Sequence, residues 1–273
     1  MTHLPVHGDL RRFLLLTFAI NWAIAATFML APPHIARALG EFALGSPAFY
    51  VAVYAPTIAA VALAWRRQRE SGAVTRLFRS LIAPGHWAWF PVSLALLPLL
   101  IIAGQYLAFL LQLREQPVDV RAWLHGLRDA LWSTRIVSDP GALGEELGWR
   151  GFALPLLLLR YPALIAGAIL GLIWGVWHLP AFYVPSLPHS TISIAAFICL
   201  AIALSVIMAW LYVQTGGNVV FAGILPHFMI NACLGTGQVR IDWQTNAIVW
   251  MFVAALLARH GVHLRGHNGQ LSE

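Results

Sequence analysis

The chain has 273 residues, of which 59% are hydrophobic and only 10% are charged. A soluble domain of this size carries about 25% charged residues, so the composition excludes an ordinary soluble protein and predicts a polytopic membrane protein. The formal net charge is +6, and all 17 basic residues are arginine. This charge does not indicate a nucleic-acid partner. The length suits one membrane bundle, so we expect no second, soluble domain.

About eight apolar runs follow one another along the chain. A bilayer core takes about 20 helical residues, and each run is close to that length. The predicted spans are about 13–31, 47–65, 87–113, 140–159, 163–183, 191–214, 218–234 and 243–258. The first run also resembles a signal peptide, but further spans follow it, so we expect it to be retained. The predicted fold class is all-α, a polytopic membrane bundle, with residues 1–273 forming a single membrane domain.

Charged residues between the runs indicate how the bundle is oriented. Five arginines lie between the second and third runs, where the positive-inside rule predicts a cytoplasmic loop: Arg66, Arg67, Arg69, Arg76 and Arg79. An even number of spans then places both ends of the chain in the cytoplasm. Residues 114–138 mix charges with apolar side chains at helical spacing, as at Val120, Leu124, Leu127 and Leu131. We expect an amphipathic helix at the membrane interface there.

The segment 139–155 carries the most unusual group of charges. Two adjacent carboxylates, Glu145 and Glu146, and one arginine, Arg150, lie at the head of an apolar run. Ionisable groups in membrane spans are costly and usually mark function. In a helix, Glu146 and Arg150 are four residues apart and form a favoured ion pair, while Glu145 points to another side. We therefore expect Arg150 to neutralise Glu146 and to leave Glu145 free for chemistry, although a purely structural charge cluster at the interface is also possible.

Local signals fix where this helix begins and where it bends. Asp139 is a favourable N-cap, and Pro140 suits the first helical position. Pro155 leaves the carbonyl of Gly151 without its helical donor, so we expect a kink there.

Two later spans add the other polar groups. The fifth span has glycines at four-residue steps, which favours close helix packing, and His178 follows them on the same stripe. The seventh span has His227 and Asn231 four residues apart, on one face. Because neighbouring spans run in opposite directions, Glu145, His178 and His227 all fall toward the same face of the membrane.

These groups resemble the motifs of the CAAX prenyl protease 2 (Rce1-like) group, also called the CPBP or Abi family of intramembrane proteases. The family's patterns are E-E-x-x-x-R, F-x-x-x-H and H-x-x-x-N. They occur here as Glu145-Glu146-Leu-Gly-Trp-Arg150, Trp174-Gly-Val-Trp-His178 and His227-Phe-Met-Ile-Asn231. Trp174 replaces the usual Phe but keeps an aromatic residue four positions before the histidine. The resemblance covers about residues 139–235, which it identifies as a CAAX protease-like catalytic core.

The resemblance implies hydrolysis of a peptide bond within or beside the bilayer. Glu145 would be the general base toward water, with His178 as its partner on that water. His227 and Asn231 would donate hydrogen bonds to the developing oxyanion, while Glu146 and Arg150 support the site. No cofactor is then needed. A zinc-dependent form stays open, because Glu145, His178 and His227 are also a catalytic zinc set.

Two other function classes stay open. A transporter or channel can use such groups as an ion path, but no inverted repeat of the kind that many transporters have is evident. A catalytically silent scaffold or bacteriocin self-immunity protein has no need for desolvated carboxylates. The expected partners are the bilayer and a peptide or protein substrate, which can carry a lipid. We expect a multi-pass protein of the bacterial plasma membrane that binds no nucleic acid.

Overall fold

The protein is all-helical in the computed structural model, which describes residues 6–31, 37–38, 40–67, 72–83, 87–132 and 139–264. No strand occurs in these ranges, which confirms the predicted fold class. The main helices are α1 (Val6–Leu30), α3 (Pro47–Val53), α4 (Ala55–Arg66), α6 (Ala73–Arg79), α7 (Phe90–Leu110), α8 (Val120–Trp132), α10 (Pro140–Gly148), α11 (Leu154–Leu158), α12 (Ala163–Trp177), α13 (Ile194–Gln214), α14 (Leu225–Gly235) and α15 (Trp243–His260). Arg69 and the 133–138 end of the predicted interfacial helix lie outside the described residues.

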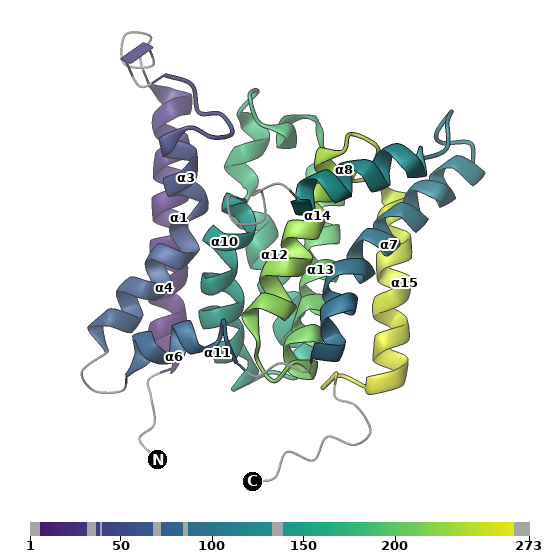
Figure 1. The fold of residues 1–273 in the computed structure, drawn as a ribbon. Helices are drawn as coiled ribbons and strands as arrows, with labels where there is room; N and C mark the ends of the chain where they lie inside the picture. The colour runs from purple at the N-terminus through teal and green to yellow at the C-terminus, as the bar shows by residue number, and fades with distance from the viewer. Residues whose placement is uncertain are drawn as a thin grey trace.

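The long helices stand side by side and alternate in direction, so α1 begins and α15 ends at the same end of the bundle (Figure 1). Judged by length and composition, four helical stretches of the described residues can cross a membrane: 8–30, 87–110, 163–183 and 194–214. The pair α3 and α4, bent by 57°, would be a fifth. The other predicted spans are helical as α10–α11, as 220–235 and as α15. A count of about eight crossings therefore stays a prediction.

Helix α8 lies across one end of the bundle (Figure 1). It buries Trp123, Leu127 and Ala130, which are spaced by four and three residues, against the rest of the protein. Leu124 and Leu131 are instead 52% and 39% exposed. The helix is thus amphipathic as predicted, but Val120 is also 37% exposed, so Leu127 is the one buried residue of the four at the predicted apolar spacing.

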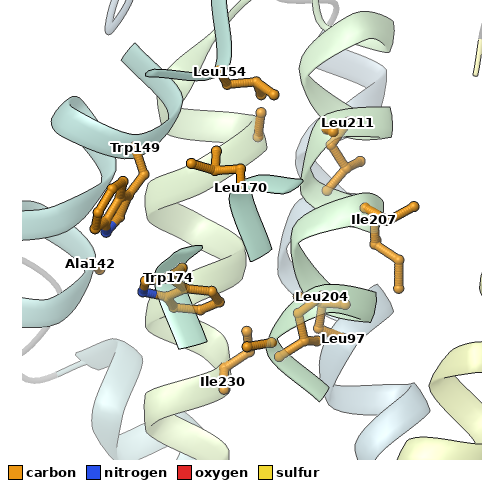
Figure 2. Packing of buried hydrophobic residues seen from close by; sticks show 14 of the residues in the cluster. Leu97, Ala142, Trp149, Leu154, Leu170, Trp174, Leu204, Ile207, Leu211 and Ile230 are labelled. Carbon is orange, nitrogen blue, oxygen red and sulfur yellow. The ribbon is translucent and has the colours of Figure 1, made fainter. Parts of the chain in front are cut away.

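Glycine permits the closest packing in the bundle. A Cβ atom on Gly171 of α12 would lie only 2.5 Å from the Cα atom of Ile202 in α13, and one on Gly148 would lie 2.4 Å from the backbone of Pro56 in α4. Backbones that approach this closely hold α12 against α13, as the glycine spacing in the fifth span predicts, and they also hold α10 against α4. Figure 2 shows Leu170 and Leu204 among the large side chains that fill the interior beside these contacts.

Two prolines are each preceded by a widened turn. The helix over 140–158 has a π turn at Trp149–Ala153, directly before Leu154 and Pro155, and a second π turn at Val220–Ile224 precedes Pro226 in the same way. A proline ring cannot donate to the carbonyl four residues earlier and clashes with it. An extra residue in the turn relieves that clash. At Pro155, where the sequence predicts a kink, the structure has this π turn.

Candidate active site

A cavity of about 930 Å³ lies among the helices and holds most of the polar groups singled out in the sequence. Helix α10 and its N-cap, the end of α12, the segment 188–191 and α14 each contribute to its wall. The polar side chains that they supply include Asp139, Glu145, His178, His189, His227 and Asn231. The structure therefore brings together residues from the three motifs and the helix N-cap, and these lie up to 92 positions apart.

Glu146 and Arg150 form an ion pair that is completely buried behind this wall. Arg150 Nη1 lies 2.9 Å from Glu146 Oε1, and both side chains are 0% exposed. Arg150 Nη2 lies 3.2 Å from Met208 Sδ. The same Glu146 oxygen lies 2.7 Å from His227 Nδ1. Gly223 of the second π turn makes room for the carboxylate, because a Cβ there would lie 2.6 Å from Glu146 Oε2. Glu146 thus links α10 to α14.

Glu145 points elsewhere, as helix geometry predicts. Its Oε2 accepts a hydrogen bond of 2.6 Å from the indole Nε1 of Trp174 on α12. Its Oε1 makes no hydrogen bond to any residue in the described ranges, although the side chain lines the cavity and is only 3% exposed. One carboxylate oxygen is therefore held, while the other is available to a molecule in the cavity.

His178 directly follows the last residue of α12, and aromatic rings surround its imidazole. Its Nδ1 lies 2.8 Å from the carbonyl oxygen of Trp174, so Nδ1 carries the hydrogen and Nε2 keeps its lone pair. The ring of His189 stacks on it with centroids 5.4 Å apart, and Phe197 and Trp177 contact it at 5.1 Å and 4.8 Å. These contacts fix the orientation of the His178 ring.

Asn231 is bound to the helix N-cap. Its Nδ2 donates to both carboxylate oxygens of Asp139, at 3.2 Å and 3.1 Å. Asp139 also accepts from the backbone amides of Gly141 and Ala142, as the predicted N-cap should. A carboxylate can only accept, so the Asn231 amide must turn its nitrogen toward Asp139. Asn231 and His227 lie on the same face of α14, but each is bound to a different acidic residue.

Three contacts of this site were not anticipated from the sequence. The sequence predicts Asp139 only as a helix N-cap and Trp174 only as the aromatic residue four positions before His178. His189 belongs to no motif. His189 lies in the segment between α12 and α13, and burial lowers the pKa of its imidazole to about 4, so the ring is neutral at pH 7. Its proximity to His178 is a tertiary contact that no local spacing signals.

The side chains do not form a recognisable metal centre. Within the described residues, no group of three or more His, Cys, Asp or Glu is disposed to hold an ion. The alternative zinc set of Glu145, His178 and His227 lines one cavity, but it is not such a group in the described residues.

The motifs lie within a stretch of the chain that is similar to a known protein family. Residues 127–233 match the family model of the type II CAAX prenyl endopeptidases, Rce1-like. We call this matched stretch the Rce1-like segment, after the family that it resembles. A stretch of 93 residues is also 30% identical to CAAX prenyl protease 2 of Methanococcus maripaludis, covering 32% of this chain and 34% of that relative. The match thus spans about a third of the curated relative's length, and the resemblance inferred from the motifs is confirmed.

The Rce1-like segment contains every polar cavity residue described above, but it does not contain the whole cavity. Asn21 of α1 and Phe42, Phe49 and Tyr50, from the loop before α3 and from α3 itself, also line it and precede the matched residues. The chemistry-bearing groups therefore lie within the matched residues, whereas part of the cavity wall lies outside the match.

Proposed function

We propose that this chain is a membrane-embedded endopeptidase that hydrolyses a peptide bond of a substrate at the bilayer. The single observation that supports this most strongly is the convergence of the Glu145, His178 and His227 motifs on one cavity. The Rce1-like match over residues 127–233 supports the same activity. The multi-pass helical architecture fits an integral membrane protein, and we place it in the bacterial plasma membrane.

Glu145 and His178 activate the water in this proposal. The unengaged Glu145 Oε1 takes a proton from water, while the Nε2 lone pair of His178 accepts a hydrogen bond from the same water. The water oxygen then bonds to the carbonyl carbon and forms a tetrahedral intermediate. The C–N bond breaks as Glu145 passes its proton to the leaving nitrogen, which regenerates the carboxylate. Glu146 and Arg150 hold α10 and α14 in place around this step.

His227 and Asn231 lie on the oxyanion side, with unequal contributions. His227 Nδ1 donates to Glu146, so its Nε2 donates to an oxyanion only when the ring is doubly protonated. Asn231 has one amide hydrogen committed to Asp139, and the Asp139 carboxylate repels a nearby oxyanion. Removal of an oxyanion donor typically costs about 10²–10³-fold in rate. We expect His227→Ala to reach that range and Asn231→Ala to cost less.

The substrate is a peptide or protein that carries an apolar group next to the cleaved bond. Phe42, Phe49, Ala181 and Leu187 line the cavity, and Phe42 and Leu187 belong to one buried cluster. Such a surface suits a lipid chain better than a charged side chain. The name of the Methanococcus maripaludis relative refers to a prenylated Cys-a-a-X end, which is the chemistry that we propose for the substrate here.

The test is cleavage of a quenched fluorescent peptide that ends in a prenylated Cys-a-a-X sequence, by purified protein in lipid nanodiscs. We expect cleavage to continue in the presence of a strong chelator. We also expect the purified protein to contain no stoichiometric zinc. Stoichiometric zinc with reversible loss of cleavage on chelation would support the zinc-dependent form with the same residues. No cleavage of prenylated or unmodified peptides would favour the scaffold or self-immunity alternative.

A further inference from the structure

Trp174 contacts four residues of the proposed site: Glu145, Arg150, His178 and His227. Its indole N–H donates to Glu145, and its ring lies 4.8 Å from the guanidinium carbon of Arg150. Its ring centroid lies 5.6 Å from that of His178 and 5.3 Å from that of His227. Its own carbonyl accepts from His178 Nδ1. Figure 2 shows the side chain in the interior of the bundle, and only 5% of it is exposed.

These contacts divide into two kinds. Ring packing against the two histidines and Arg150 needs only an aromatic side chain, so the phenylalanine of the family motif would supply it. The hydrogen bond to Glu145 needs an N–H group, which phenylalanine lacks. The exchange of Phe for Trp at this position therefore adds one function to the site, and that function concerns Glu145 alone.

Glu145 has few other means of being oriented. Arg150 is engaged with Glu146 and Met208, and within the described ranges Trp174 is the one residue that donates a hydrogen bond to the Glu145 carboxylate. A glutamate side chain has three rotatable bonds. A base must hold its acceptor oxygen within hydrogen-bond reach of the water that it deprotonates. The hydrogen bond from the Trp174 N–H to Oε2 restrains the carboxylate and so fixes the position of Oε1.

We propose that Trp174 is a positioning residue that orients the Glu145 carboxylate by its indole N–H and thereby directs Oε1 into the cavity. This inference rests on the proposed function, in which Glu145 is the base. Trp174 acts through Glu145 and not on the substrate, so its loss lowers the rate of the chemical step and leaves substrate binding nearly unchanged.

The direct test is Trp174→Phe, assayed with the prenylated reporter peptide. A hydrogen bond to a charged group is typically worth a factor of about 10–150, so we expect kcat to fall by about 10–100-fold with KM within about twofold. Trp250→Phe is the matched control, because Trp250 Nε1 donates to the carbonyl of Cys199 and Trp250 does not line the cavity. That variant should keep wild-type kcat.

Replacing Trp174 by 3-benzothienylalanine, which keeps the shape and lacks the N–H, should reproduce the loss even if the phenylalanine variant is unstable.

A double variant separates this role from plain packing. In the Glu145→Gln background, Trp174→Phe should not lower the residual rate further, because no base remains to be oriented. An equal further loss would overturn the inference and assign Trp174 to packing alone. Full kcat in both Trp174 variants, with Glu145→Gln inactive, would also overturn it while leaving the proposed function intact. Full activity in Glu145→Gln would instead remove Glu145 as the base, and with it the inference, whereas absence of cleavage by the wild-type protein would remove the proposed function.

Discussion

Two walls of the same cavity are built in different ways. The catalytic wall comprises Asp139, Glu145, His178, His227 and Asn231, and hydrogen bonds hold each of these side chains in place. The apolar wall comprises Phe42, Leu44, Phe49, Ala52 and Leu187, and ring and methyl packing holds it, as where Phe42 meets Phe28 and Phe49 at 5.2 Å and 6.1 Å. The difference separates chemistry from recognition: changes in the first wall should alter kcat, and changes in the second should alter KM.

The largest expected effect on the catalytic wall outside Glu145 is that of His178→Ala. The substitution removes the Nε2 partner of the attacking water, and such participation is worth about 10²–10⁴-fold in rate. We expect kcat to fall by that order while KM changes little, measured with the prenylated reporter peptide. The control is His263→Ala, because His263 is exposed and does not line the cavity. A His178→Ala protein with wild-type kcat would remove His178 from the mechanism.

Arg150→Ala tests what holds the catalytic wall in place. The change leaves Glu146 as a buried carboxylate without its ion-pair partner, which typically costs about 3–5 kcal/mol. We expect a lower yield and a clearly lower Tm in detergent. Arg128→Ala breaks an exposed ion pair with Asp129, whose side chains are 64% and 65% exposed, and such pairs contribute about 1 kcal/mol at most. Equal Tm values for the two variants would contradict the structural role of Arg150.

How much of the site can be read from the sequence depends on the distance between partners along the chain. The Glu146–Arg150 pair follows from helix periodicity, as does the different direction of Glu145, and the glycines of α12 indicate its close packing. The partners of Glu145, Glu146 and Asn231 on other elements lie 29, 81 and 92 residues away. No local rule specifies these contacts, because they depend on how whole helices pack. The apolar wall has no motif at all, and its residues are ordinary apolar residues until the fold places them at the cavity.

Asp139→Asn sharpens the account of the catalytic wall. The amide can still cap α10, but it no longer forces the Asn231 nitrogen toward it, so Asn231 can reverse. We expect kcat to change by about tenfold or less with little change in Tm, because one neutral hydrogen bond contributes about 1 kcal/mol. Asp242→Asn is a matched control: Asp242 caps α15 and accepts from the amide of Gln105, but it does not line the cavity. Indistinguishable kcat in both variants would assign Asp139 to capping alone.

The smallest expected effect lies on the apolar wall. Leu187 is 3% exposed and lines the cavity, so Leu187→Ala removes apolar surface from a bound lipid chain. Burial of such a side chain contributes about 1.5–3 kcal/mol, and part of that loss should raise KM for the prenylated peptide by about tenfold. KM for the unmodified peptide and kcat should change less. Leu172→Ala, at a residue that is 48% exposed on α12, should leave both constants unchanged. A lower kcat with unchanged KM in Leu187→Ala would contradict the division between the two walls.

The central claim is that Glu145 is the base that activates water. Glu145→Gln keeps the size of the side chain and can still accept from the indole of Trp174, but an amide cannot take the proton. The measurement is kcat for the prenylated reporter peptide, together with Tm, for Glu145→Gln and for Glu115→Gln, which changes an exposed glutamate. We predict that Glu145→Gln loses about 10²–10⁴-fold in kcat at an unchanged Tm, while Glu115→Gln matches the wild type. A stable Glu145→Gln protein that cleaves the peptide at the wild-type rate would contradict the account.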